Sequence, residues 1–271
     1  MGVNPTIGLI GVGNMGMPVA RRLVGAGYAI SVFARRPEVI AESKNLGASI
    51  VGSISDVGST SEVVIVNVFS DDQVREVALG PDGVVAHMRA GSTLVNHTTG
   101  RPSTIEAVAE AGASRGVRIL DGAMSGGPHD IDAGKLTLLV GGDIAALEEL
   151  RPVFESYSDP ILHVGRVGDA QKVKLLNNAL FGAQVALVAR IEAAALELDI
   201  DASRVLGAIH ACSGDSYALT TALMIGSAAQ LVEAAARWIE KDVAVCADVA
   251  AELGLDLGPV LATARQVKAS A

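Results

Sequence analysis

The sequence predicts an α/β domain with a parallel, doubly wound sheet over residues 1–165, followed by an all-helical domain over residues 166–271. Three observations lead to this prediction. Short apolar runs rich in β-branched residues alternate with helical patterns as far as about residue 165, a glycine-rich turn follows the first run, and only helical patterns occur after Gly168. A chain of 271 residues, half of them hydrophobic, has enough material for both cores.

The expected strands of the first domain are short apolar runs bounded by turn residues. They are Thr6–Ile10, Ala29–Ala34, Val63–Val68, Thr93–Asn96, Arg118–Ala123, Leu136–Val140 and a shorter run near Ile161–Val164 that would end the sheet. Helices are expected between the strands. The run Ser103–Glu106 has the spacing of a capping box and predicts a helix to about Ser114. Asp143 is expected to cap another helix over Ile144–Phe154.

The second domain begins after a boundary near Gly165–Gly168. Asp169 is expected to cap a long helix over Ala170–Asp199, which contains almost no helix-breaking residue. Further helical patterns cover Ala202–Ala211, Ala222–Cys246 (with a break allowed), Val249–Leu253 and Pro259–Lys268.

Composition excludes several classes of partner. The formal net charge is −9, and no basic patch stands out beyond Arg35-Arg36, which argues against nucleic acid. Two cysteines are too few for a disulfide framework or a cysteine-based metal site. Neither a signal peptide nor an uninterrupted apolar span is recognised, so we expect a cytoplasmic protein without a membrane partner. His129, Asp130 and Asp132 form a polar cluster, but their spacing resembles no set of metal ligands, so no metal is expected.

A glycine motif directly follows the first expected strand. Gly11-Val12-Gly13-Asn14-Met15-Gly16 lies between that strand and a helical pattern, which is the context in which G-x-G-x-x-G indicates dinucleotide binding in a Rossmann domain. Gly11 would make the tight turn, Gly13 would let the backbone approach a pyrophosphate, and Gly16 would let the helix pack against the strand. The helix N-terminus would then face the phosphates.

The end of the second expected strand indicates which dinucleotide binds. An acidic residue there bonds the ribose 2′-hydroxyl of NAD, whereas arginine accommodates the 2′-phosphate of NADP. Here Arg35 and Arg36 follow the strand, and the first carboxylate is Glu38, beyond the turn. The sequence therefore favours NADP over NAD, although two exposed arginines after a strand have no special meaning elsewhere.

The start of the long helix carries two amine and two amide side chains. Lys174 and Asn178 are four residues apart and therefore share one face, whereas Lys172 has the surroundings of an ordinary surface lysine. A lysine beside a dinucleotide can act as a proton donor. Spacing alone also fits a solvated helix end.

Five segments in order resemble the β-hydroxyacid dehydrogenase family, which includes 3-hydroxyisobutyrate dehydrogenase, tartronate semialdehyde reductase and glyoxylate/succinic semialdehyde reductases. The segments are Gly11–Gly16 with its flanks, Asp121–Gly127, Gly134–Gly142, Gly165–Asn178 and Lys241-Asp242. The resemblance implies a nucleotide domain like that of 6-phosphogluconate dehydrogenase and a homodimer or larger assembly formed through the helical domain. The apolar runs Ala193–Leu198 and Ala234–Ile239 point the same way.

The resemblance also implies roles for individual residues. Lys174 would be the general acid and base, with Asn178 as its partner. Ser125, Gly126, Gly127 and Lys241 would hold a substrate carboxylate. The cofactor would contact Gly11, Val12, Gly13, Asn14, Met15, Gly16, Arg35, Arg36, Val68, Phe69, Thr99 and Lys241. The chain departs from the family at Pro128–Ile131, where a small Gly-Ala element is usual.

The expected function is hydride transfer between NADP(H) and a small 3-hydroxy acid or aldehyde acid. Two alternatives are an imine reductase-like relative of the same fold and a non-catalytic dinucleotide-binding scaffold. Loss of the catalytic lysine would mark the second, and related imine reductases carry a different residue at that position. Lys174 is present.

Overall fold

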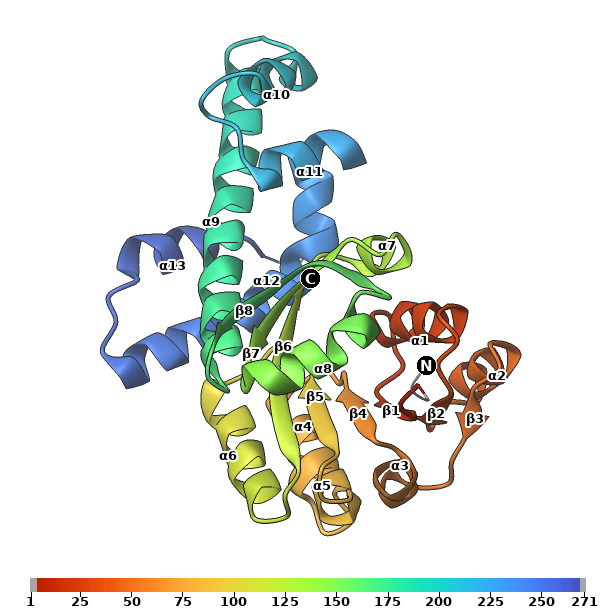
Figure 1. The fold of residues 1–271 in the computed structure, drawn as a ribbon. Helices are drawn as coiled ribbons and strands as arrows, with labels where there is room; N and C mark the ends of the chain where they lie inside the picture. The colour runs from red at the N-terminus through yellow and green to blue at the C-terminus, as the bar shows by residue number, and fades with distance from the viewer. Residues whose placement is uncertain (1–3, 269–271) are drawn as a thin grey trace. The chain divides into compact units, whose positions relative to one another are not determined.

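The computed structural model describes residues 4–268, so the outermost residues of both predicted domain ranges, 1–3 and 269–271, lie outside the described part (Figure 1). The chain divides into two compact units between Lys174 and Leu175. The first is an α/β unit and the second is helical, which confirms the predicted fold class.

The first unit is built on one eight-stranded sheet with the strand order β3-β2-β1-β4-β5-β6-β7-β8. The strands are β1 Ile7–Ile10, β2 Ile30–Phe33, β3 Ser49–Ile50, β4 Val63–Val66, β5 Thr93–Asn96, β6 Arg118–Ser125, β7 Leu136–Gly141 and β8 Ser158–Gly165. β1 and β4 are buried along their whole length, as expected for central strands covered on both faces.

Two strands, β7 and β8, run opposite to the other six. β7 pairs antiparallel with β6, whereas every other neighbouring pair is parallel. The connection between β6 and β7, residues 126–135, is shorter than the dozen or more residues that a parallel crossover needs. The predicted parallel sheet is therefore confirmed except at this one antiparallel pair, whose connection is too short for a crossover.

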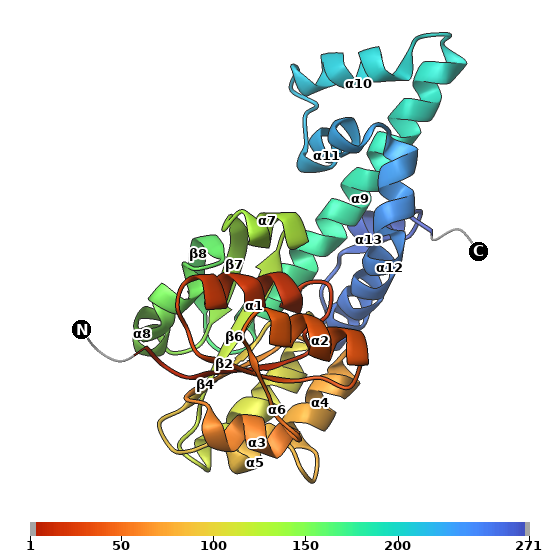
Figure 2. The same ribbon diagram turned by 90° about the vertical axis from the view of Figure 1, so that its right-hand side faces the viewer.

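Helices cover both faces of the sheet (Figure 2). They are α1 Gly16–Gly25, α2 Pro37–Asn45, α3 Ile54–Thr60, α4 Asp71–Leu79, α5 Val84–His87, α6 Pro102–Ala113, α7 Pro128–Asp132 and α8 Ile144–Phe154. One core contains buried side chains of α1, α2, α7 and α8, and a separate core contains those of α3, α4, α5 and α6. An apolar layer therefore covers each face of the sheet, and polar groups can gather only at the ends of its strands.

The first residues of three helices, α8, α6 and α9, can be compared with the predicted caps. Asp143 caps α8 as predicted, because its carboxylate accepts the Ala145 N–H at 3.1 Å. The predicted capping box at Ser103 is wrong. The N-cap of α6 is Arg101, two residues earlier, and the helix begins at Pro102, whose fixed φ suits the first helical position. Asp169 is the first residue of α9 rather than its cap, and its carboxylate accepts the Arg166 N–H at 2.9 Å.

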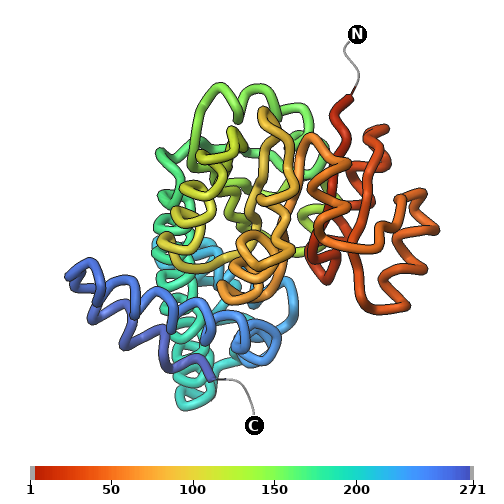
Figure 3. The backbone as a smooth tube through the Cα atoms, turned by 90° about the horizontal axis from the view of Figure 1, so that it is seen from below, coloured from red at the N-terminus to blue at the C-terminus, as the bar shows by residue number. Residues whose placement is uncertain are grey.

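The second unit continues from a long helix that starts in the first. The helices are α9 Asp169–Glu197, α10 Ala202–His210, α11 Tyr217–Ile225, α12 Ala228–Leu253 and α13 Gly258–Ala264. α9 and α12 cross (Figure 3) and share a core. A Cβ on Gly182 of α9 would lie only 2.8 Å from the Ile239 side chain of α12. The predicted helix from Ala222 is interrupted at Gly226, which has a φ of +113°, and Ser227 caps α12.

Among residues 4–268, α9 is the one helix whose length and apolar composition would allow it to cross a membrane. α11 and α12 would be long and apolar enough only if they formed one span, and the two are bent by 113° at the break between them. Leu175, Ala179 and Val185 of α9 are at most 1% exposed in the core of the second unit. One side of α9 therefore serves the protein's own core.

Candidate active site

The glycine turn after β1 is fixed by the chain itself at two of its three glycines. Gly11 has a φ of +94°, and a Cβ there would lie 2.1 Å from the Asn67 carbonyl oxygen. A Cβ on Gly16 would lie 2.3 Å from the Gly11 carbonyl oxygen. Gly13 differs, since a Cβ there would meet no protein atom within 4 Å. The backbone at Gly13 therefore faces open space, as a turn that receives a ligand must.

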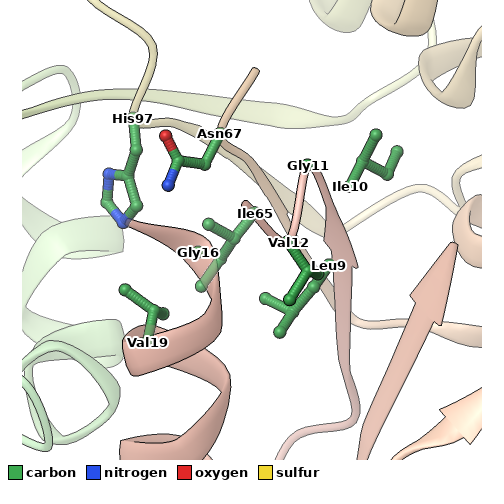
Figure 4. Close-up of a pocket in the computed structure, with 9 residues that line it drawn as sticks. All are labelled: Leu9, Ile10, Gly11, Val12, Gly16, Val19, Ile65, Asn67 and His97. Carbon is green, nitrogen blue, oxygen red and sulfur yellow. The ribbon is translucent and has the colours of Figure 1, made fainter. Parts of the chain in front are cut away.

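The first turn of α1 suits an anion. Met15 precedes the helix without a side-chain cap, and no acidic residue lies in the first turn. The N-terminal N–H groups and the positive end of the helix dipole are thus not neutralised by the protein. A small cavity lies under this turn, lined by Leu9, Ile10, Gly11, Val12, Gly16, Val19, Ile65, Asn67 and His97 (Figure 4).

Other predicted cofactor residues follow neighbouring strands at the same edge of the sheet. β1, β2, β4 and β5 are parallel, so the segments after their carboxyl ends meet at one edge, where ligands bind in open α/β sheets. Asn14 and Phe69 are exposed, and Thr99 is half-buried. The Val68 N–H donates to the Thr98 hydroxyl at 2.9 Å, which ties the segments after β4 and β5 together.

The two arginines after β2 have different surroundings. Arg36 lies at the N-cap of α2 and forms an ion pair with Glu38 at 3.4 Å. Arg35 is also exposed, but its guanidinium makes no hydrogen bond or ion pair within residues 4–268. The single carboxylate of this turn is therefore engaged by Arg36, and the Arg35 guanidinium remains available to a phosphate.

The predicted substrate loop differs from expectation at Gly127. Ser125 ends β6 and Gly126 has a φ of +132°. The Gly127 N–H, however, donates to Asp130 Oδ2 at 2.7 Å, so it is not free to bind a substrate carboxylate. Asp130 is the third residue of α7, a position from which a side chain reaches back to the residue before the helix. That spacing in the sequence was the signal that our prediction missed.

A buried polar network anchors the start of α9. Asp121 is fully buried, and its carboxylate accepts the Gln171 backbone N–H at 2.9 Å and the Gln171 Nε2 at 2.6 Å. Gln171 Oε1 in turn accepts the Gly100 N–H at 2.9 Å. Burial raises the pKa of Asp121 to about 6, and the hydrogen bonds from Gln171 oppose that rise. Sequence reasoning missed Gln171, which lies three residues before Lys174.

Lys174 is buried, at 9% exposure, in the second turn of α9. Asn178 lies one turn later on the same face of the helix. Within the second unit, Asn178 Nδ2 donates to Asp242 Oδ2 at 2.6 Å, and Lys241 Nζ lies 3.2 Å from Asp242 Oδ1. Asp242 therefore holds both Asn178 and Lys241, a role that sequence reasoning did not assign.

His97 is a structural residue despite its place after β5. Its ring nitrogens lie 2.5 Å from the Gly122 carbonyl oxygen and 2.9 Å from the Tyr157 hydroxyl. Burial lowers the pKa of His97 to about 4, so the ring is neutral at physiological pH.

No group of three or more metal-ligating side chains is found in the described part of the chain.

Comparisons with known proteins agree with this arrangement. Residues 6–165 match the domain family described as the NAD binding domain of 6-phosphogluconate dehydrogenase, and residues 168–271 match that described as NAD-binding of NADP-dependent 3-hydroxyisobutyrate dehydrogenase. An NAD-dependent L-serine dehydrogenase of Pseudomonas aeruginosa is 34% identical over 79% of the chain and 72% of its own length. A 3-hydroxyisobutyrate dehydrogenase of the same organism is 33% identical over the same shares.

Solved structures show the same fold over nearly the whole chain. The 3-hydroxyisobutyrate dehydrogenase of Mycobacterium tuberculosis, solved with L-serine, superposes with a TM-score of 0.87 at 26% identity and covers 97% of this chain and 92% of its own. Psf3 in complex with NADP⁺ and 2-OPP superposes with a TM-score of 0.82 at 25% identity, covering 96% and 92%.

Proposed function

The chain belongs to the β-hydroxyacid dehydrogenase family and is an NAD(P)-binding oxidoreductase; from this we propose that it uses NADP(H), with Lys174 as general acid and base. The proposed reaction interconverts a small 3-hydroxy acid and the corresponding aldehyde acid. One observation carries the proposal: a buried lysine lies in the second turn of a helix whose first turn is fixed by Asp121 and Gln171.

The nicotinamide, when bound, supplies or accepts the hydride. In the direction of reduction, Lys174 donates a proton to the carbonyl oxygen, and in oxidation it takes that proton from the hydroxyl. Asn178 is an uncharged hydrogen-bonding partner one turn along the helix. Asp242 fixes its amide group through the 2.6 Å contact.

Preference for NADP rests on the segment after β2. Arg35 presents an unpaired guanidinium there, and a guanidinium binds a phosphate through two parallel hydrogen bonds. A carboxylate that would repel the 2′-phosphate is absent before Glu38, which is held by Arg36.

The test is NADPH consumption over a panel of small semialdehydes and 2-oxo acids, with NADH run in parallel. Replacing Lys174 with alanine removes the proton donor, so we expect kcat to fall by about 10²–10⁴-fold while NADPH binding is unchanged. Lys172→Ala is the matched control: Lys172 lies on the same helix, but its ammonium pairs with Asp169 at 2.9 Å. Full turnover in Lys174→Ala would contradict the proposed role.

A further inference from the structure

Three hydrogen bonds connect the end of β6, the start of α9 and the segment that follows β5. Asp121 Oδ1 accepts the Gln171 Nε2 at 2.6 Å, and Asp121 Oδ2 accepts the Gln171 backbone N–H at 2.9 Å. Gln171 Oε1 accepts the Gly100 N–H at 2.9 Å. All three residues are buried, and Gln171 is only 1% exposed. A substitution that breaks one of these bonds therefore leaves a buried polar group unpaired.

The order of donors and acceptors in this network is fixed. An ionised carboxylate only accepts hydrogen bonds, and a backbone N–H only donates one, so the Gln171 amide must turn its NH2 group to Asp121 and its oxygen to Gly100. Glutamine meets both requirements, whereas ionised glutamate lacks the donor and an aliphatic side chain lacks both groups. The residue type at position 171 is therefore dictated by its two partners.

The segment after β5, residues 98–101, includes Thr99, which is a proposed contact of the cofactor. The Asp71 carboxylate of α4 holds the end of this segment by accepting the Arg101 N–H at 2.9 Å. Gln171 holds the residue before that end and joins the segment to α9. The position of the segment relative to α9 thus depends on one buried amide group.

Lys174 follows Gln171 by three residues, so the two side chains leave α9 on the same face. Both residues belong to the first unit. The bonds of Gln171 therefore fix the helical turn that presents the Lys174 ammonium. Proton and hydride transfer depend steeply on such geometry, since a displacement of about 1 Å can cost about 10²-fold in rate.

We propose that Gln171 is a positioning residue: by joining α9 to residues 98–101, it sets where the Lys174 ammonium stands relative to the nicotinamide. Its side chain acts on the reaction through Asp121 and Gly100 rather than by touching the substrate. This inference rests on the proposed function for the roles of Lys174 and the cofactor, and on the three hydrogen bonds for the role of Gln171.

Exchanging the two side chains tests the proposal. Gln171→Glu removes the donor to Asp121, and Asp121→Asn sets a second NH2 group against that of Gln171. The double variant Asp121→Asn/Gln171→Glu restores the order, because the new amide donates to the new carboxylate, whose other oxygen accepts the Gly100 N–H. We expect kcat to fall about 10²-fold in each single variant and to return to within about fivefold of wild type in the double variant. The dissociation constant for NADPH should be unchanged in all of them.

A pH profile separates positioning from a simple loss of folded protein. In Gln171→Glu the two facing carboxyl groups can share one proton, so the missing donor returns as pH falls. We expect its kcat relative to wild type to rise about tenfold from pH 8 to pH 6, with no such rise in Asp121→Asn. Asp169, whose charge also acts on Asp121, is present in every variant.

Lys172→Ala is the control, because Lys172 lies on the same turn of α9 and its ammonium pairs with Asp169 at 2.9 Å. It is expected to keep the wild-type kcat at both pH values. Fluorescence titration of bound NADPH counts the folded molecules in each preparation. Wild-type kcat in either single variant, or a double variant no more active than the single variants, overturns the inference.

Amide exchange distinguishes failure of this inference from failure of the proposed function. If the wild-type protein reduces no carbonyl compound, the proposed function is refuted, and hydrogen–deuterium exchange at the Gly100 N–H still tests the link made by Gln171. Slow exchange in wild type and in the double variant, with faster exchange in both single variants, would support that link. Equal exchange rates in all four proteins would refute it.

Discussion

Arg35 and Arg36 show how adjacent identical side chains can have separate functions. The Arg36 guanidinium is paired with Glu38, whereas the Arg35 guanidinium has no partner in the described part of the chain. If Arg35 binds the 2′-phosphate of NADP, its loss removes hydrogen bonds between charged groups, each worth about 1.5–3 kcal/mol.

We therefore expect Arg35→Ser to raise the dissociation constant for NADPH by about 10–100-fold and to leave that for NADH unchanged. Titration of nucleotide fluorescence measures both constants. Arg36→Ser provides the comparison, with a smaller effect on NADPH. Equal losses of NADPH affinity in the two variants would assign the phosphate to the pair rather than to Arg35.

Site residues that belong to a sequence motif could be predicted from the sequence, whereas the polar residues that contact them could not. The glycines after β1 and the lysine of α9 lie in motifs with fixed spacing. Gln171, Asp130 and Asp242 take part through contacts whose geometry depends on the fold, such as the 2.6 Å hydrogen bond between Gln171 and Asp121. Nothing in the residue type reveals such a contact before the elements are placed.

At the scale of elements, the link between β6 and α9 makes stability depend on pH. The carboxyl group of Asp121 has a pKa of about 6 in the folded protein, against an ordinary value of 3.8. The folded state therefore holds a proton that the unfolded chain releases. This group's contribution to the free energy of unfolding is complete below pH 4 and is lost as pH rises through 6.

Replacing Asp121 with asparagine removes this ionisation while keeping a similar shape. We expect the stability of Asp121→Asn relative to wild type to increase by about 3 kcal/mol between pH 4 and pH 7. Urea denaturation at both pH values measures the difference. His97, whose depressed pKa acts in the opposite direction, is present in both proteins and cancels. A relative stability independent of pH would show that Asp121 does not titrate in this range.

Most strands and helices were predictable because their apolar periodicity is strong, and the exceptions have local causes. β3 has two residues, too few to form a pattern. The start of α6 is set by Pro102 rather than by the capping spacing beside it. The direction of β7 depends on the length of the connection between β6 and β7, and the apolar pattern of the two strands does not reveal that direction.

At the scale of the whole molecule, α9 carries an apolar stripe that its own chain leaves exposed. The stripe consists of Leu176, Leu180, Leu187 and Ile191, which are 43–57% exposed. Their spacings of four, seven and four residues place them on one face of the helix. Such a face on a protein surface is typical of an interface, and it supports the proposed assembly of this chain with a second copy.

Introducing two negatively charged side chains into this stripe should prevent two copies of the chain from associating. We expect the double variant Leu180→Glu/Leu187→Glu to be monomeric and wild type to be at least dimeric, as measured by light scattering after size-exclusion chromatography. Leu196 is 67% exposed on the opposite face of α9, so Leu196→Glu should leave the assembly intact. A wild-type monomer would contradict the proposal.

The glycine turn has a consequence for how this sequence can change over generations. The chain's own atoms exclude a side chain at Gly11 and at Gly16, but not at Gly13. A lineage that kept the fold and stopped using a nucleotide would retain the outer two glycines and be free to drift at the middle one. In a duplicated gene whose product no longer binds the cofactor, position 13 is therefore where we expect the first replacement of a motif glycine.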